Sequence, residues 1–197
     1  MVSALYVDVE NGPYPELLGA QACWGVERDA KGYRGPGPVI AHPPCGPWGQ
    51  LARWCVHQDP TCGPIAVEQV RRFGGVLEHP IATRLRAVCG LPSPFRSLPL
   101  VAPREWSLSV EQVRWGHPTR KRTLLFFVGV QPRDLGPIPP SREPTHYLGG
   151  EREYRRRMAQ LGRKKLGGGG SYAARITPVN FARWLIEGVR RYAERIA

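Results

Sequence analysis

Short apolar runs that each lead into a proline turn constrain the fold of this chain more than any other feature. Residues 5–9, 38–42 and 75–79 are apolar enough to form buried strands, and a proline follows each of them closely. Between the second and third runs, residues 64–73 place apolar side chains at helical spacing and end at two glycines. A strand, a helix and a strand in succession predict an α/β fold, in which ligands bind where the strands end.

Further runs extend this pattern on both sides. Residues 23–29 are interpreted as a strand that ends in acidic residues, and residues 108–113 and 123–130 as two more strands. Thr177 and Pro178 are typical of the N-cap and first residue of a helix, which we expect to continue almost to the C-terminus. The apolar face of this helix is predicted to comprise Phe181, Trp184, Leu185, Val189 and Tyr192.

The composition indicates one folded domain over residues 1–197. Hydrophobic residues make up 42% and charged residues 22%, close to globular proportions, while 23 glycines and 21 prolines predict long loops. Residues 131–175 are interpreted as a basic Pro/Gly-rich insertion or minimal recognition region, in which 150–162 favours a helix. No apolar run approaches the length of a membrane span and no secretory signal pattern is present, so we expect a cytoplasmic protein.

The net charge of +12 predicts a polyanionic partner, most often nucleic acid. Arginine supplies 24 of the 28 cations, and guanidinium groups favour bidentate phosphate contacts. Residues 151–197 carry 12 of these cations and only 4 of the 16 acids, so the basic region is C-terminal. The alternative is an arginine-rich protein whose charge only keeps it soluble. The predicted nucleic-acid contacts are Trp48, Arg155, Arg156, Arg157, Lys164 and Lys165.

Five cysteines, an odd number in a chain of this length, argue against a disulfide framework. Cys55, His57 and Cys62, with Cys45 or His42 nearby in sequence, offer a set of zinc ligands. Their spacing is irregular, however, and no Cys-x2-Cys pair occurs. We therefore expect reduced thiols and no metal.

Three segments place reactive or charged residues where a strand meets a rigid turn. They read His-Pro-Pro-Cys-Gly-Pro-Trp at 42–48, Leu-Glu-His-Pro at 77–80, and a basic loop at 112–122. In this order they resemble the DNA cytosine-5 methyltransferases, which carry a Pro-Cys loop, a Glu-Asn-Val strand end and a loop with Arg-x-Arg. The segment at 23–29 also resembles the family's strand whose terminal Glu binds the ribose of S-adenosylmethionine. The resemblance spans most of the chain and implies a truncated Rossmann-like, methyltransferase-type sheet with flanking helices.

The resemblance also implies roles for individual residues. Cys45 would be the nucleophile and Glu78 the proton donor, while Arg120 and Arg122 would hold a phosphate or orient the adduct. Cytosine C5 becomes nucleophilic only after a thiolate adds to C6 and a proton reaches N3, so the chemistry needs both groups. The partner implied is DNA or a pyrimidine nucleotide, and the cofactor implied is S-adenosylmethionine. The cofactor-binding residues would be Asp8, Glu27 and Asp29.

Both reactive groups need altered pKa values for these roles. Cys45 lies between Pro44 and Gly46 near a basic surface, so we expect its pKa to be lowered. Glu78 ends an apolar strand, so we expect burial to raise its pKa. The structural alternatives are a packing role for Cys45, an ion pair with an arginine for Glu78, a solvated turn for the basic loop and a core position for Trp48.

The chain departs from the family after its first strand, where a glycine-rich turn should approach the cofactor. Residues 8–15 contain one glycine there. Only 17 positions separate Glu27 from Pro44, too few for the strand and helix that normally precede the family's adenine-binding acid. We therefore predict weak or no binding of S-adenosylmethionine, with another group donor in its place.

Two functions of different classes follow. The first is modification of pyrimidine C5, with cytosine in DNA as the preferred target, through a cysteine nucleophile. The second is a catalytically inactive, methyltransferase-like accessory protein, of the kind a phage or mobile element carries, that binds nucleic acid. A third interpretation compares residues 42–45 with the Asp/Asn-Pro-Pro-Tyr motif of amino-methyltransferases, but the aromatic residue of that motif is missing here.

Overall fold

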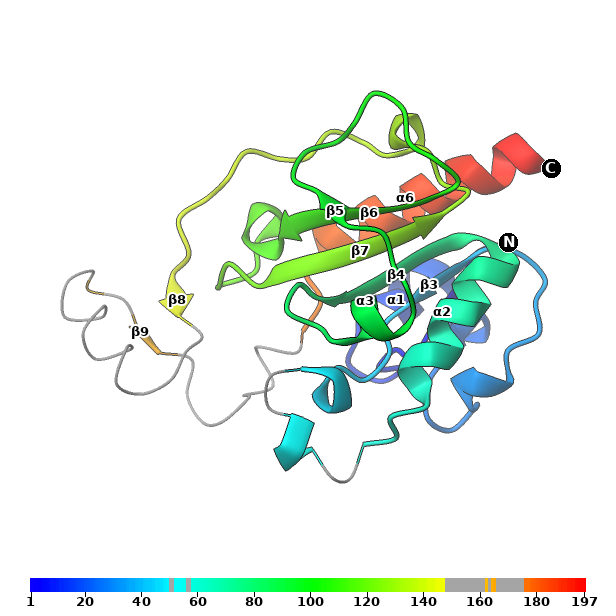
Figure 1. Cartoon of the computed structure of the whole chain (residues 1–197), viewed down its shortest axis with the longest axis horizontal. Coiled ribbons are helices and arrows are strands. Elements are labelled where there is room, and N and C mark those ends of the chain that lie inside the picture. The colour runs from blue at the N-terminus through cyan, green and yellow to red at the C-terminus, as the bar shows by residue number, and fades with distance from the viewer. Residues whose placement is uncertain (50–51, 56–57, 148–161, 163, 166–175) are drawn as a thin grey trace.

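The computed structural model describes residues 1–49, 52–55, 58–147, 162, 164–165 and 176–197, and Figure 1 shows their arrangement. A seven-stranded mixed sheet forms the centre of the molecule, which confirms the predicted α/β class. In spatial order the strands are β2 (Cys23–Trp24), β1 (Ser3–Leu5), β3 (Val39–Ala41), β4 (Gly75–Pro80), β7 (Arg122–Val128), β6 (Glu105–Glu111) and β5 (Pro94–Phe95).

Strand direction divides the sheet into two halves. Strands β2, β1, β3 and β4 are parallel, so their carboxyl ends meet at one edge. Strand β7 runs antiparallel to both β4 and β6, and it places Leu125 opposite Glu78. The turn that enters β7 therefore lies beside the carboxyl end of β4, close to the ends of the parallel strands.

Helices cover both faces of the sheet (Figure 1). On one face lies α2 (Cys62–Phe73), and on the other lie α1 (Tyr14–Leu18) and α6 (Val179–Ile196), as the two buried clusters of apolar residues show. The short α3 (Leu85–Val88) adds to the α2 face. Six 3-10 turns complete the described helices: η1 (Ala20–Ala22), η2 (Ala30–Gly32), η3 (Gly46–Trp48), η4 (Ala52–Trp54), η5 (Gln112–Trp115) and η6 (Pro132–Asp134).

Side-chain alternation along β4 decides which residues meet at each face. Val76 packs into the cluster under α6, whereas Leu77 packs into the cluster under α2. Because successive side chains of a strand point to opposite faces, Glu78 lies on the α6 face and His79 on the α2 face. The same alternation in β3 places His42 on the α6 face, two residues after Ile40.

The two short parallel strands differ from their predicted bounds. The predicted strand at 5–9 is β1, which begins at Ser3 and ends at Leu5 because Tyr6 adopts a left-handed backbone with φ of 59°. The predicted strand at 23–29 pairs only at β2, after which the chain turns and Asp29 caps η2 with φ of 43°. Backbone turns after the paired residues, rather than loss of apolar character, set where these two strands stop.

The C-terminal helix forms as predicted, except at its first residue. Pro178 rather than Thr177 is the N-cap, and no side chain caps the helix there. Four residues of the predicted apolar face are buried in the core and Tyr192 packs partly buried against it. Beyond β7, Arg195 of α6 makes an ion pair of 2.7 Å with Asp134 of η6, which fastens the start of the long connection to the helix.

The long connection then leaves the sheet. Strand β8 (His146–Tyr147) pairs in parallel with β9 (Lys164–Lys165), apart from the central sheet. The predicted helix over 150–162 falls almost entirely outside the described residues, as do Arg155, Arg156 and Arg157.

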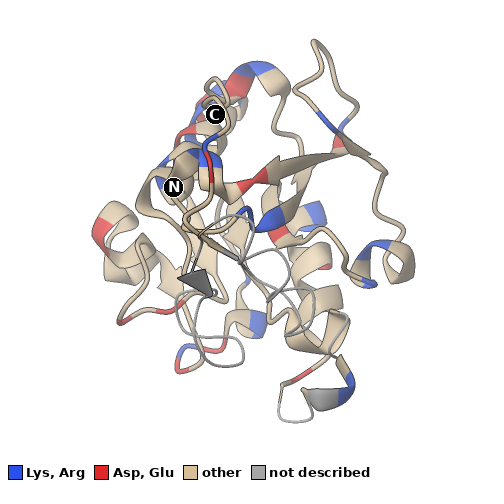
Figure 2. Ribbon diagram, turned by 90° about the vertical axis from the view of Figure 1, so that its left-hand side faces the viewer, with Lys and Arg blue, Asp and Glu red and all other residues tan. Residues whose placement is uncertain are grey.

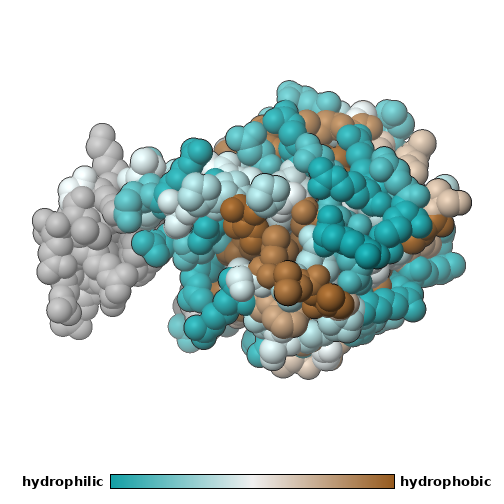
Figure 3. All heavy atoms as spheres, turned by 90° about the horizontal axis from the view of Figure 1, so that it is seen from above, coloured by the Kyte–Doolittle hydropathy of each residue, from teal (hydrophilic) through white to brown (hydrophobic). Residues whose placement is uncertain are grey.

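Two surface features complete the fold. Seen from above, hydrophobic side chains form a patch bordered by hydrophilic ones (Figure 3). In the connection between β5 and β6, Leu100 is fully exposed and Val101 is largely exposed. Among the described helices, none is both long and apolar enough to cross a bilayer.

Candidate functional site

A cavity of about 590 Å³ lies at the carboxyl ends of β1, β3 and β4. Its walls come from the segment after β1, the ends of β3 and β4, the turn that enters β7, and the two residues before Pro178. This is the edge where α/β sheets bind their ligands, and the volume lies within the usual range of ligand pockets, about 300–1,000 Å³.

The cavity brings together several of the predicted site residues. Cys45, Glu78 and Arg122 of the predicted catalytic set line it, together with Asp8 of the predicted cofactor set. Arg120 does not line the cavity, and its half-exposed guanidinium lies 3.9 Å from the Glu111 carboxylate at the end of β6. The predicted role of Arg120 at the reacting group therefore stays a prediction.

A chain of hydrogen bonds runs from the cavity wall into the core. The Tyr14 hydroxyl lies 2.6 Å from His42 Nε2, and His42 Nδ1 lies 3.1 Å from Glu78 Oε2. From the other side, Gln112 Nε2 donates to Glu78 Oε1 at 2.9 Å and to the Thr123 hydroxyl at 3.0 Å. These five residues, called the Glu78 network below, hold both carboxylate oxygens of Glu78 in place.

Glu78 is ionised at neutral pH, contrary to the prediction. Burial alone raises the pKa of its carboxyl, but the charge of Lys121 and the hydrogen bond and charge of His42 outweigh burial, and the net pKa falls to about 2. A carboxylate next to a ring nitrogen accepts a hydrogen bond, so we assign the Nδ1 proton to His42. When His42 is neutral, its Nε2 then accepts a hydrogen bond from the Tyr14 hydroxyl.

The electrostatic setting of Cys45 also differs from the prediction. The residue is exposed at the cavity, yet desolvation of its thiol by the surrounding loop and the charge of Glu78 raise the pKa. Lys121 acts in the opposite direction and lowers the pKa, without reversing the net shift. The prediction relied on a basic surface near Cys45. Among the described cations Lys121 lowers the pKa of this thiol, but the Glu78 carboxylate in the same cavity raises it.

Backbone strain marks the same cavity. Among the described residues other than glycine, three have positive φ, and two of them, Tyr6 at 59° and Lys121 at 24°, line the cavity. Such conformations cost free energy and cluster at functional sites. The Tyr6 hydroxyl donates to Gln69 Oε1 at 2.8 Å, so α2 holds this strained residue in position.

The segment after β1 does not fit S-adenosylmethionine as the resemblance implies. Asp8 Oδ1 accepts hydrogen bonds from the backbone N–H groups of Glu10 and Asn11, and the Asp8 carbonyl accepts from Gly12. These amides therefore close the turn on itself instead of facing a ligand. Any side chain at Gly12 would collide with the Asp8 carbonyl oxygen, which shows how tight the turn is.

The other two predicted cofactor residues lie outside the cavity. Glu27 is exposed in the turn after β2, and the Asp29 carboxylate accepts the backbone N–H of Lys31 at 3.3 Å. With β2 reduced to two residues, the predicted ribose anchor is not carried to the cavity. Among the described residues, Asp8, Glu27 and Asp29 thus do not come together as the S-adenosylmethionine site that the resemblance implies.

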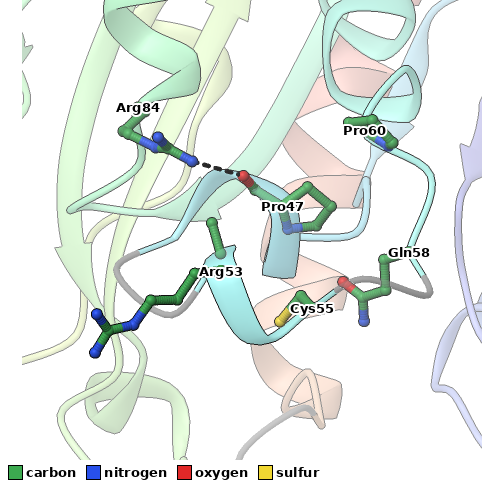
Figure 4. Close-up of a pocket in the computed structure, with 7 residues that line it drawn as sticks. Pro47, Arg53, Cys55, Gln58, Pro60 and Arg84 are labelled. Atoms are coloured by element: carbon green, nitrogen blue, oxygen red, sulfur yellow. Dashed lines mark hydrogen bonds between the residues drawn. The ribbon is translucent and has the colours of Figure 1, made fainter.

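Trp48 lies on the α2 face, and its predicted contact with nucleic acid stays a prediction. Its ring packs partly buried against the core, and its indole N–H donates to the Pro60 carbonyl at 3.2 Å. A second cavity of about 430 Å³ adjoins the same loop, and Figure 4 shows Arg84 directed at the Pro47 carbonyl, to which it donates at 3.1 Å. This cavity includes Cys55 and none of the residues of the Glu78 network.

The described residues include some of the candidate metal ligands and some of the predicted nucleic-acid contacts. They contain no group of three or more His, Cys, Asp or Glu side chains that could hold a metal, and His57 lies outside them. Lysine and arginine are scattered over many elements (Figure 2). Of the predicted C-terminal contacts, the structure describes only the backbone of Lys164 and Lys165, in β9.

Sequence reasoning missed part of this site. His42 stood in a segment already singled out, but the only functional role considered for it was that of a zinc ligand. Gln112 begins the basic loop at 112–122, yet no role was assigned to it, and Tyr14 had no local signal, because only the packing of the sheet brings these residues to Glu78. Comparisons with family models, with curated proteins and with solved structures found no match to this chain.

Proposed function

We propose that this protein modifies the C5 position of a pyrimidine, preferably cytosine in DNA, with Cys45 as the nucleophile. The observation that carries the proposal is one cavity in which an exposed cysteine and a buried, ionised carboxylate come from the ends of two neighbouring strands. The volume of about 590 Å³ suits a single nucleoside. A base reaches such a cavity from a single strand, or by flipping out of a duplex.

The chemistry requires a covalent adduct. The Cys45 thiolate adds to C6 of the pyrimidine, the electrons of the C5–C6 double bond move into the ring, and a ring heteroatom takes a proton. The adduct is nucleophilic at C5 and takes an electrophilic group or a proton there. Loss of the original C5 hydrogen as a proton then expels Cys45 and restores the double bond.

The surroundings of Cys45 support a charged substrate. Lys121 and the exposed Arg122 line the cavity, and cations at its rim attract the phosphate of a nucleotide. Because the turn after β1 is closed, the group donor in this proposal is an electrophile other than S-adenosylmethionine.

Exchange of the C5 hydrogen tests the proposal without knowledge of the donor, because protonation of the adduct at C5 needs only water. The protein is incubated in deuterium oxide with deoxycytidine monophosphate, a single-stranded oligonucleotide and a duplex, and deuterium at cytosine C5 is measured by mass spectrometry. We expect exchange that Cys45→Ser abolishes and Cys89→Ser, at the end of α3, leaves within about twofold. Equal exchange in Cys45→Ser, or no exchange with any substrate, would contradict the proposal.

One observation favours the second candidate function, a binding protein without chemistry. The raised pKa of Cys45 keeps most of its thiol protonated at neutral pH, and a thiol is a poor nucleophile. If the oligonucleotides bind but no cytosine exchanges its C5 hydrogen between pH 7 and pH 9, the accessory role replaces the enzymatic one.

A further inference from the structure

We propose that Tyr14 donates the proton that the bound base requires and that His42, held by Glu78, resupplies it. This relay rests on the proposed function, because it acts on the adduct formed by Cys45. It gives a role to two residues that neither the sequence motifs nor the resemblance assigned.

Two hydrogen bonds connect residues from three separate parts of the fold. Tyr14 is the first residue of α1, His42 follows β3, and Glu78 lies near the end of β4. The two distances are 2.6 Å from the Tyr14 hydroxyl to His42 Nε2 and 3.1 Å from His42 Nδ1 to Glu78 Oε2. Tyr14 is 1% exposed, and both Tyr14 and His42 line the cavity, so their hydrogen bond lies at the cavity wall.

The direction of the first hydrogen bond depends on the protonation state of His42. A neutral His42 with its proton on Nδ1 accepts a hydrogen bond from the Tyr14 hydroxyl at Nε2. That hydroxyl then has no hydrogen left to donate to a ligand. A protonated His42 donates from both nitrogens, so the Tyr14 oxygen accepts and its own proton is free for a group in the cavity. Protonation of the His42 side chain therefore converts Tyr14 into a hydrogen-bond donor toward the ligand.

Charged groups gather around His42. The Glu78 carboxylate contacts its Nδ1 at 3.1 Å, and Asp8, Lys121 and Arg122 line the same cavity.

The proton transfer balances without a co-reactant. As the Cys45 sulfur bonds to C6, the displaced electrons move to the ring, and a ring heteroatom takes the Tyr14 proton. The Tyr14 oxygen takes the Nε2 proton of the imidazolium, which leaves His42 neutral and Tyr14 protonated. Tyr14 thus never becomes a stable phenolate, which burial and the charge of Glu78 disfavour by raising its pKa. Elimination of Cys45 reverses each transfer.

Tyr14→Phe and Tyr33→Phe form a matched pair for the test. Each removes one hydroxyl from a buried tyrosine, and the Tyr33 hydroxyl donates to the Pro36 carbonyl at 2.9 Å, away from the cavity. With the single-stranded oligonucleotide, we expect Tyr14→Phe to lower kcat for C5 exchange by about 10²–10⁴-fold, the usual effect of losing a general acid. Oligonucleotide affinity, and alkylation of Cys45 by iodoacetamide, should remain within about twofold, and Tyr33→Phe should match the wild type throughout.

The pH profile supplies a readout that a purely structural role would not move. Exchange requires a thiolate, which increases with pH, and an imidazolium, which decreases with pH, so the wild-type profile should pass through a maximum. In His42→Gln the side chain cannot titrate, and only the rising limb should remain. Wild-type kcat in Tyr14→Phe, or a maximum retained in His42→Gln, would overturn the relay while leaving the proposed function intact. Absence of exchange in the wild type would overturn both.

Discussion

Glu78 and His79 are neighbours on β4, but they lie in opposite environments. Glu78 faces α6, where it has three polar partners and borders an open cavity. His79 faces α2 and is fully buried, and its ring makes no well-formed hydrogen bond among the described residues, although the Pro44 backbone lies near enough to act on its pKa. Burial lowers the pKa of His79 to about 4, so it is neutral at physiological pH. The contrast shows that side-chain alternation in one strand separates a group that lines the cavity from one that only fills the core.

The largest expected difference between the two neighbours is in activity. Glu78→Gln removes the charge that holds His42 as a donor, and we expect the rate of C5 hydrogen exchange to fall by about 10²-fold or more. His79→Gln changes the other face of β4 and should leave the rate within about threefold. Measurement of exchange by mass spectrometry checks both variants. A larger loss in His79→Gln would break the comparison.

The dependence of stability on pH should also separate the two residues. The pKa of Glu78 falls from 4.5 to about 2 on folding, so its contribution to stability is present above pH 4.5 and lost as the pH falls toward 2. The pKa of His79 falls from 6.5 to about 4, so the folded state loses stability as the pH falls from 6.5 toward 4, where the unfolded chain binds the proton first. Each shift corresponds to a free energy on the order of 3 kcal/mol.

Urea unfolding between pH 3 and pH 8 measures these two windows. We expect Glu78→Gln to flatten the lower window and His79→Leu to flatten the upper one. At pH 7, His79→Leu should be neutral or stabilising, because it removes a buried imidazole that makes no well-formed hydrogen bond among the described residues. A strong loss of stability at pH 7 in His79→Leu would show that the imidazole has a partner after all.

A smaller effect should appear in the reactivity of Cys45. Because the Glu78 charge raises the pKa of this thiol and the Lys121 charge lowers it, Glu78→Gln should speed alkylation at pH 8, and Lys121→Met should slow it. Each change is expected to be at most about tenfold, the effect of one pKa unit on the thiolate fraction. Peptide mass spectrometry after a timed iodoacetamide pulse follows Cys45 separately from the other cysteines. Equal rates in the two variants would contradict the electrostatic assignment.

The smallest expected effect concerns the two arginines of the basic loop. Arg122 lines the cavity, whereas Arg120 lies near Glu111 on the outer side. Arg122→Gln should weaken binding of deoxycytidine monophosphate by about five- to tenfold through loss of a charge-assisted contact, and Arg120→Gln by less than about twofold. Calorimetric titration measures both affinities. The reverse order would place the phosphate on the outer side of the loop.

The strongly periodic elements could be predicted from the sequence because their signal is local. Helices α2 and α6 and strands β4 and β7 each have a run of apolar residues at one clear period, and they appear within a few residues of the predicted bounds. Proline and glycine next to Cys45 and Glu78 marked these residues as strand ends, and both line the cavity. Local chemistry was sufficient for this part of the site because strand ends of a parallel sheet gather at one edge.

Only the tertiary structure decided how the site is charged and which residues complete it. The sequence predicts a low pKa for Cys45 and a high pKa for Glu78, and the structure reverses both. Desolvation and then the Glu78 charge raise the pKa of the thiol, while Lys121 and His42 lower that of the carboxyl. Tyr14 joins the site because folding brings α1 within hydrogen-bond distance of His42, which is 28 residues away along the chain. Electrostatic and hydrogen-bond energies depend on distances between residues that are remote in sequence, so composition and spacing identify the groups and folding sets their protonation.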